Sequence, residues 1–243
     1  MTDTPRPAFV TGIGSVIAPV VVSIILSACG GPDGASPIEP GTAAREAMLD
    51  VRSRGCGPRV GFGTATMIDP TLALTAAHVV AGASTVSVID ERGEEHAARV
   101  VWLDPDLDIA ALRVPTGVGV AVELQPTDAD DSDIGAISVS RGAFDDRVIT
   151  TLDVQIPRHV DVSTTDIYLE ADVVRPGFEI MGEIEPGDSG TMVVTSAGAA
   201  GIVWSRSNTT AGRAWAVDVP DDFRRPAFRN ALGGDVDTGH CLH

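Results

Sequence analysis

Twelve short β-type segments follow one another between residues 61 and 219, at the intervals that hairpin turns require. Aromatic residues make up only 4% of the chain and hydrophobic residues 44%, so the core must consist largely of Val, Ile, Leu and Ala, a mixture that favours strands. The segments form two sets of about six, which predicts an all-β protein in two halves within one domain. The first set is 61–68, 72–77, 84–89, 97–104, 109–114 and 120–125, and the second is 135–140, 147–156, 166–172, 190–196, 199–206 and 213–219.

The acidic stretch 126–135, "PTDADDSDIG", separates the two sets. It does not fit a calcium loop, because Asp133 occupies the position of the sharp-turn glycine and Val139 that of the bidentate glutamate. We therefore expect a solvated connector and no metal site. The formal net charge of −17 excludes a nucleic-acid partner, since affinity for phosphate backbones comes from basic side chains.

The first 28 residues differ from the rest of the chain, being uncharged and mostly apolar from Ala8 to Ala28. The sequence Leu26-Ser27-Ala28-Cys29 is typical of a bacterial lipobox, which predicts cleavage of 1–28 and lipidation of Cys29. The alternative is an uncleaved membrane anchor, because the apolar stretch from Ala8 to Ala28 approaches the length of about 20 residues that a membrane span needs. Residues 29–43 are rich in Pro and Gly and predict a flexible linker. Either reading predicts a domain, 44–243, anchored to the membrane outside the cytoplasm.

Ser189 lies in the sequence "GEIEPGDSGTMVV", where glycines flank it on both sides. Such a stretch could be an ordinary turn, since Gly, Asp and Ser are common turn residues. A serine hydroxyl becomes a nucleophile only beside a base, and His78 in "LTAAHVVAG" is a candidate. Asp108 could orient that imidazole, because it leads directly into an apolar strand. The rival carboxylates Asp104 and Asp106 do not, and are expected in a solvated loop.

The chain order His78, Asp108, Ser189 distinguishes among serine hydrolases, because the same triad occurs in different orders on unrelated folds. This order belongs to the two-barrel chymotrypsin type. The G-x-S-x-G nucleophile elbow of α/β-hydrolases is absent, since Thr191 stands two residues after the serine. The order therefore agrees with the all-β pattern.

With these motifs, residues 55 to 243 resemble the trypsin-like (chymotrypsin-fold) serine proteases. More narrowly, "GFGTATMI", "LTAAHVVAG", "RPGFEI", "EPGDSG" and "VDTGHC" resemble the periplasmic protease domain of actinobacterial MarP-type proteins. The chain departs from the family at Thr191-Met192, where Gly-Pro is common, which puts local packing and substrate fit in doubt. We also expect it to differ from those proteins in having no multi-helix membrane domain.

The resemblance implies two six-stranded Greek-key barrels, at about 55–125 and 134–220, followed by a C-terminal helix and tail at 221–243. It implies a serine endopeptidase without a cofactor or metal ion, acting on protein or peptide substrates. The backbone N–H groups of Gly187 and Ser189 would form the oxyanion hole, where a side chain at position 187 would obstruct the turn. By analogy, the substrate pocket contains Glu183, Trp204, Ser205, Arg206 and Ala214. A pseudoprotease or peptide-binding module, and an esterase or transferase on the same scaffold, remain alternatives.

The two remaining cysteines, Cys56 and Cys241, form an even pair outside the cytoplasm once Cys29 is lipidated. MarP-type proteins resemble this arrangement, so we expect a disulfide that joins the C-terminal tail to the start of the first barrel. Arg59-Val60-Gly61 superficially resembles a zymogen cut site, but it lies where the first barrel strand must run. We therefore expect no activation by insertion of a new amino terminus beside Asp188.

Overall fold

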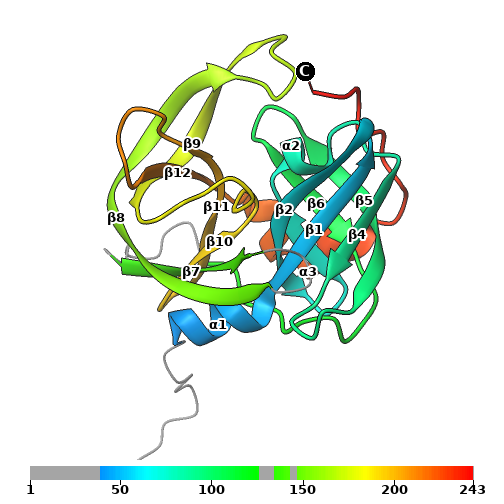
Figure 1. Cartoon of the computed structure of the whole chain (residues 1–243), viewed down its shortest axis with the longest axis horizontal. Helices are drawn as coiled ribbons and strands as arrows, with labels where there is room; N and C mark the ends of the chain where they lie inside the picture. The colour runs from blue at the N-terminus through cyan, green and yellow to red at the C-terminus, as the bar shows by residue number, and fades with distance from the viewer. Residues whose placement is uncertain (1–38, 126–133, 143–146, 243) are drawn as a thin grey trace, which may run out of the picture. The chain divides into compact units, whose positions relative to one another are not determined.

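The computed structural model describes residues 39–125, 134–142 and 147–242, which belong to one compact unit. Its strands form two six-stranded closed barrels, in the spatial orders β1-β2-β3-β6-β5-β4 and β10-β11-β12-β9-β8-β7 (Figure 1). The predicted all-β, two-barrel fold is therefore confirmed. The first barrel contains β1 (Met48–Gly55), β2 (Gly57–Asp69), β3 (Leu72–Thr75), β4 (Thr85–Ile89), β5 (Glu95–Asp104) and β6 (Ile109–Arg113). The second contains β7 (Ile134–Arg141), β8 (Val148–Thr165), β9 (Asp172–Met181), β10 (Met192–Thr195), β11 (Gly198–Arg206) and β12 (Arg213–Asp218).

Short helices accompany the barrels: α1 (Pro40–Ala47), α2 (Ala77–Val80), the 3-10 turn η2 (Asp221–Arg224) and α3 (Pro226–Ala231). Helix α1 begins where the Glu39 side chain accepts the backbone N–H of Thr42 at 2.7 Å, an N-terminal cap. Within the described ranges, none of the helices combines the length and apolar character needed to cross a membrane. The predicted lipobox and Cys29 lie outside the described residues.

The first barrel begins earlier than the sequence pattern indicates. Residues 48–55 form strand β1, whose apolar Leu49 and Val51 are fully buried, although the first strand expected from the sequence was 61–68. Conversely, the expected strand at 120–125 forms only an isolated bridge, between Leu124 and Ala199. The reason is barrel closure: β1 pairs with β4, which leaves no free edge for another strand.

Strands β8 and β9 form one long hairpin, which Figure 1 shows reaching beyond the second barrel. The expected strand 166–172 is the tip of this hairpin, because the Asp166 carboxylate accepts the backbone N–H groups of Tyr168 and Glu170 and so forms a turn. Strand β9 instead follows the tip and contains Pro176 and Gly177, residues that usually interrupt strands. Glycine is needed there, since a Cβ at position 177 would lie 2.9 Å from Val217 Cα.

Strand β10 is buried on both faces and joins the cores of the two barrels. Met192 and Val194 pack into a cluster that fills the first barrel and continues between the barrels, whereas Val193 packs into the core of the second. Ser189 lies three residues before this strand. The strand therefore holds the serine turn at the junction of the barrels.

The C-terminal tail runs along the first barrel. The backbone N–H of Val236 donates to Val100 O at 3.0 Å, and that of Gly82 donates to Thr238 O at 2.8 Å. Beyond these contacts, Cys241 is disulfide-bonded to Cys56, with a Cα–Cα distance of 5.4 Å. The expected disulfide is confirmed, and Cys56 lies between β1 and β2.

Reduction of this disulfide should lower the free energy of unfolding. The two cysteines are 185 residues apart, and closing so long a loop stabilises by at most about 5 kcal/mol. Thermal unfolding with and without reductant measures the loss. A Cys56→Ser/Cys241→Ser variant should have the melting temperature of the reduced wild-type protein, and adding reductant should not change it. An unchanged melting temperature after complete reduction, checked by thiol titration, would contradict a stabilising role.

Candidate active site

His78 and Asp108 meet because their strands are neighbours. Strand β3 pairs with β6 up to Thr75 and Ala110, so helix α2, which follows β3, lies beside the residue that precedes β6. Asp108 Oδ2 is 2.8 Å from His78 Nδ1, and Asp108 Oδ1 accepts the backbone N–H of His78 at 2.8 Å. The carboxylate therefore holds both the ring and the backbone of the histidine.

The charge environment fixes the state of the His78 ring. Asp108 is an acceptor only, so Nδ1 must carry the proton, and Nε2 of the neutral ring is free to act as a base. Burial lowers the pKa of His78, but the charge of Asp108 and its hydrogen bond raise it by more. The pKa of His78 therefore lies above 6.5, the value for a free imidazole.

The serine turn is fixed to the same edge of the first barrel. Ser189 O accepts the backbone N–H of Thr64 at 2.8 Å. A Cβ at Gly190 would overlap Thr64 O and Thr75 Oγ1 and lie 3.0 Å from Ala76 N, so only glycine allows this approach. Within the described residues no hydrogen bond joins the Ser189 hydroxyl to His78, a contact that commonly tightens only when substrate binds.

The backbone of the serine turn leaves two N–H groups for a ligand. Asp188 N donates to Glu185 O and Gly190 N to Val203 O, whereas neither Gly187 N nor Ser189 N has a backbone acceptor in the described part of the chain. Gly187 has φ +103°, and a Cβ there would meet nothing within 4 Å. Glycine is therefore needed for its conformation, and the expectation that a side chain would obstruct the turn is corrected.

Arg141 of β7 binds the serine turn through the Asp188 carboxylate and Glu183 O. Its guanidinium forms two hydrogen bonds to the Asp188 carboxylate, one of them at 2.7 Å, and donates to Glu183 O at 3.2 Å. The same carboxylate accepts the backbone N–H of Glu185 at 2.7 Å, and Asp188 is only 1% exposed. An internal cation thus fills the role that a newly cut amino terminus has in zymogens, which supports our prediction of no activation by terminal insertion.

An Arg141→Gln variant should be destabilised by about 3 kcal/mol, because it leaves the buried Asp188 charge unpaired. We take the lower end of the range for buried pairs because the Arg141 side chain is 27% exposed. Denaturant unfolding measures the change. In an Arg141→Gln/Asp188→Asn variant much of the loss should be recovered, since no charge is left unpaired. Equal stability of Arg141→Gln and wild type would refute this account.

The remaining carboxylates near Asp108 are not alternatives to it. Asp104 Oδ1 accepts the backbone N–H groups of Asp106 and Leu107, so this partly exposed side chain shapes the turn. Asp106 is exposed. Neither contacts His78 in the interactions of the described residues.

The Thr191-Met192 pair fits its surroundings. Thr191 Oγ1 donates to Ser138 O at 2.8 Å, and Met192 is 1% exposed within the first hydrophobic cluster. The departure from Gly-Pro is therefore accommodated without an unpaired polar group.

The five expected pocket residues occupy different environments. The guanidinium carbon of Arg175 lies over the Trp204 ring, 4.4 Å from the ring centroid. Ala214 is fully buried in the core of the second barrel. Ser205 is half-buried, whereas Glu183 and Arg206 are exposed. Their grouping into a substrate pocket stays a prediction.

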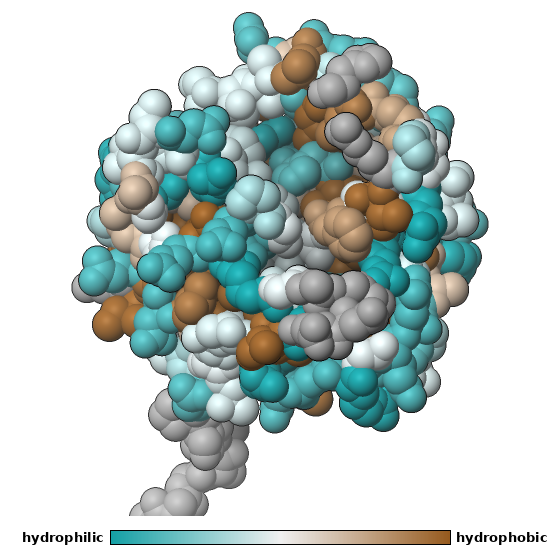
Figure 2. Space-filling view, viewed as in Figure 1, coloured by the Kyte–Doolittle hydropathy of each residue, from teal (hydrophilic) through white to brown (hydrophobic). Residues whose placement is uncertain are grey.

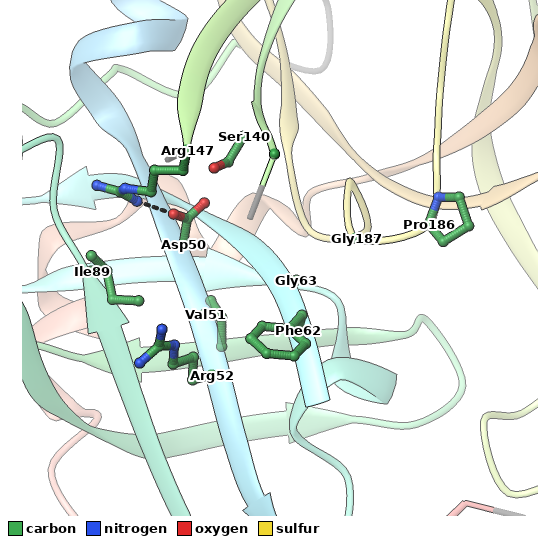
Figure 3. Close-up of a pocket in the computed structure, with 11 residues that line it drawn as sticks. Asp50, Val51, Arg52, Phe62, Gly63, Ile89, Ser140, Arg147, Pro186 and Gly187 are labelled. Carbon is green, nitrogen blue, oxygen red and sulfur yellow. Dashed lines mark hydrogen bonds and ion pairs between the residues drawn. The ribbon is translucent and has the colours of Figure 1, made fainter. Parts of the chain in front are cut away.

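Two cavities of about 300 Å³ adjoin the catalytic candidates. One is lined by His78 and by Leu242 of the tail, and the other by Gly187 and the exposed Phe62 ring. Figure 3 shows Asp50 and Phe62 on first-barrel strands, the Pro186–Gly187 turn opposite, and Arg147 bound to Asp50. In the view of Figure 1, the space-filling surface in Figure 2 shows hydrophobic patches among hydrophilic ones.

Sequence reasoning did not find Arg141 or Arg175 as parts of the site. Arg141 directly follows the expected strand 135–140, and Arg175 stands in the quoted "RPGFEI" motif, but neither position alone reveals a partner.

Comparison with known proteins gives consistent matches. The family described as "Trypsin-like peptidase domain" matches residues 63–200. The serine proteases Rv3671c and MT3772, from two strains of Mycobacterium tuberculosis, are each 31% identical over 188 residues, which is 74% of this chain and 45% of theirs. The chain therefore spans less than half the length of these relatives.

Solved structures share the fold. The crystal structure of the Rv3671c protease from M. tuberculosis in its active form matches with a TM-score of 0.72 at 24% identity, covering 86% of this chain and 94% of that one. The HtrA-type protease AlgW with tripeptide matches with a TM-score of 0.56 at 22% identity, covering 73% of this chain and 58% of that one.

Proposed function

Because this chain belongs to the trypsin-like peptidase family, we propose that it is a serine endopeptidase with the catalytic triad Ser189, His78 and Asp108. Its substrates are proteins or peptides, consistent with relatives named as serine proteases. The observation that carries the proposal is the Asp108 carboxylate bound to both the ring and the backbone of His78, at the barrel edge to which the serine turn is fixed.

The chemistry follows from these groups. His78 Nε2 takes the hydroxyl proton as Ser189 Oγ attacks the scissile carbonyl, and Asp108 stabilises the imidazolium that forms. The N–H groups of Gly187 and Ser189 donate to the developing oxyanion. The imidazolium then gives its proton to the leaving amine, which produces the acyl-enzyme, and water activated by the same histidine hydrolyses it.

The cavity beside Gly187 would receive part of the substrate next to the scissile bond. Phe62 is 59% exposed on its rim, and an exposed aromatic ring beside a catalytic turn is suited to apolar contact with a peptide. We assign Glu183, Trp204, Ser205, Arg206 and Ala214 to the substrate pocket by family analogy alone. No preferred residue is proposed.

We further propose attachment to the membrane outside the cytoplasm, either through lipidated Cys29 or through an uncleaved anchor at 8–28. The two or three acyl chains of a bacterial lipoprotein suffice for stable anchoring, whereas one chain binds only marginally. A Cys29→Ser variant should lose membrane retention or stay unprocessed. Full retention with an uncleaved N-terminus, found by mass spectrometry, would favour the anchor.

A fluorophosphonate probe tests the endopeptidase proposal. Wild-type protein should be labelled, with the adduct on the peptide that contains Ser189, and should cleave an unstructured protein substrate. Ser189→Ala should lose the label, whereas the exposed hairpin variant Ser163→Ala should keep it. Well-folded wild type that binds peptides without being labelled would sink the proposal and favour a peptide-binding module.

The rate should depend on pH through His78. Its raised pKa places half-maximal kcat/KM above pH 6.5, with activity lost as the pH falls because the imidazolium cannot act as a base. The profile of kcat/KM on a peptide substrate measures this. A rate that stays flat down to about pH 4 would contradict the role of His78.

A further inference from the structure

Arg175 is a buried cation whose compensating contacts lie at the active site. Its side chain is 3% exposed on β9, in the second barrel, whereas His78 and Asp108 belong to the first. Burial lowers the pKa of Arg175, and nearby carboxylates oppose that shift. A buried charge is costly unless it is paired and hydrogen-bonded, so its partners indicate what it stabilises.

The guanidinium binds the turn that carries Asp108. Arg175 Nε donates to Asp106 O at 2.7 Å, and Nη2 donates to Pro105 O at 3.5 Å and to Thr165 O of its own hairpin at 3.1 Å. Asp108 itself has φ +59°, an unusual conformation outside glycine. The turn before it is thus fixed from the second barrel.

The same guanidinium approaches the Asp108 carboxylate without competing for its hydrogen bonds. Arg175 Nη1 lies 3.8 Å from Oδ2, an ion pair too long for a hydrogen bond, and both side chains are 3% exposed. Oδ2 therefore remains available to His78 Nδ1 at 2.8 Å. In this buried setting the ion pair is little screened.

The indole of Trp204 covers the guanidinium at 4.4 Å, a distance suited to cation–π attraction. Trp204 lies on β11, so two strands of the second barrel hold the cation in place. The hairpin tip adds one further contact, from Ile167 N to Pro105 O at 3.2 Å.

We propose that Arg175 is a positioning residue of the triad, which fixes the Asp108 turn and balances the Asp108 charge, so that the second barrel sets the orientation of His78. The inference rests on the proposed endopeptidase function for its kinetic consequence, though not for its structural one.

The electrostatic consequence has a definite sign. The charged groups that act on His78 are the Asp108 carboxylate and the Arg175 guanidinium. The carboxylates that act on Arg175 are those of Asp108, Asp104, Asp106 and, from the hairpin tip, Asp166. The charge of Arg175 lowers the pKa of His78, against the larger upward effect of Asp108. Removing that charge should raise the pKa of His78 further, because the imidazolium loses a repulsive neighbour.

An NMR titration of the His78 ring in a Ser189→Ala background tests this without requiring activity. Arg175→Gln should raise the pKa of His78. The matched control is Arg158→Gln on the adjacent strand β8, whose side chain is 60% exposed and pairs with Glu179. It should leave the His78 titration unchanged.

With Ser189 present, Arg175→Gln should lower kcat/KM by about 10- to 100-fold, the range expected when a catalytic group is slightly misplaced. On the acidic side of its pH profile, the fall in kcat/KM should move to higher pH, which a general loss of stability would not cause. Arg175→Lys keeps a positive charge but not the planar set of donors, so it should lower kcat/KM while leaving this fall nearer the pH of wild type.

If Arg175→Gln does not fold, the Lys variant provides the test through its lowered kcat/KM. A folded Arg175→Gln variant with the wild-type His78 pKa and pH profile would overturn the proposal, as would wild-type kinetics in Arg175→Lys. If the fluorophosphonate probe does not label the wild-type protein, the endopeptidase function is refuted. The NMR titration would still show whether the charge of Arg175 affects the pKa of His78.

Discussion

Replacing either Ser189 or His78 by alanine should lower kcat by about 10⁶-fold, and replacing both should lower it little further, because nucleophile and base act as one unit. Without His78 the hydroxyl keeps its proton, and without Ser189 there is no oxygen to acylate. Residual catalysis would come from the oxyanion N–H groups and substrate binding.

Steady-state hydrolysis of an activated ester or peptide measures the loss, with protein from a host lacking other serine proteases. His159→Ala is the matched control for the histidine, since His159 is exposed on β8, and should retain wild-type kcat. Retention of more than about one hundredth of kcat in Ser189→Ala would show that another group is the nucleophile.

An Asp108→Asn variant should lose about 10⁴-fold in kcat. Asparagine tolerates the positive φ of this position. Its amide, however, donates a hydrogen bond to Nδ1 where the carboxylate accepts one, so the proton moves to Nε2 and the ring can no longer take the Ser189 proton.

The matched control is Asp106→Asn, an exposed carboxylate in the same turn whose backbone oxygen, not its side chain, contacts Arg175. It should change kcat by no more than about twofold, as expected for a surface side chain outside the catalytic contacts. A similar loss in both variants would mean that the turn, not the Asp108 carboxylate, is what catalysis requires.

Most of the fold could be predicted from residue pattern, but the strand predictions failed at three places: β1, the range 120–125 and β9. Strand β1 was missed because its alternation of apolar Leu49 and Val51 with polar Asp50 and Arg52 is short and directly follows a helix, so the period of two is hard to recognise. The β9 strand was missed because Pro176 and Gly177 are usual interruptions, and only the close packing of Gly177 on the neighbouring strand explains them.

The sequence alone indicated the residues for the proposed chemistry. The order of His78, Asp108 and Ser189, the glycines around the serine and the spare pair of cysteines are all readable along the chain, because each depends on the kind of functional group and not on its distant neighbours.

Only the tertiary structure decided which charges support that chemistry. Arg141 meets Asp188 and Arg175 meets the Asp108 turn across 47 and about 70 residues, after the barrels have closed and packed together. Seventeen arginines were equally available by sequence. Burial makes these two important, because a charge removed from water must find its partner within the fold, and the fold alone brings that partner near.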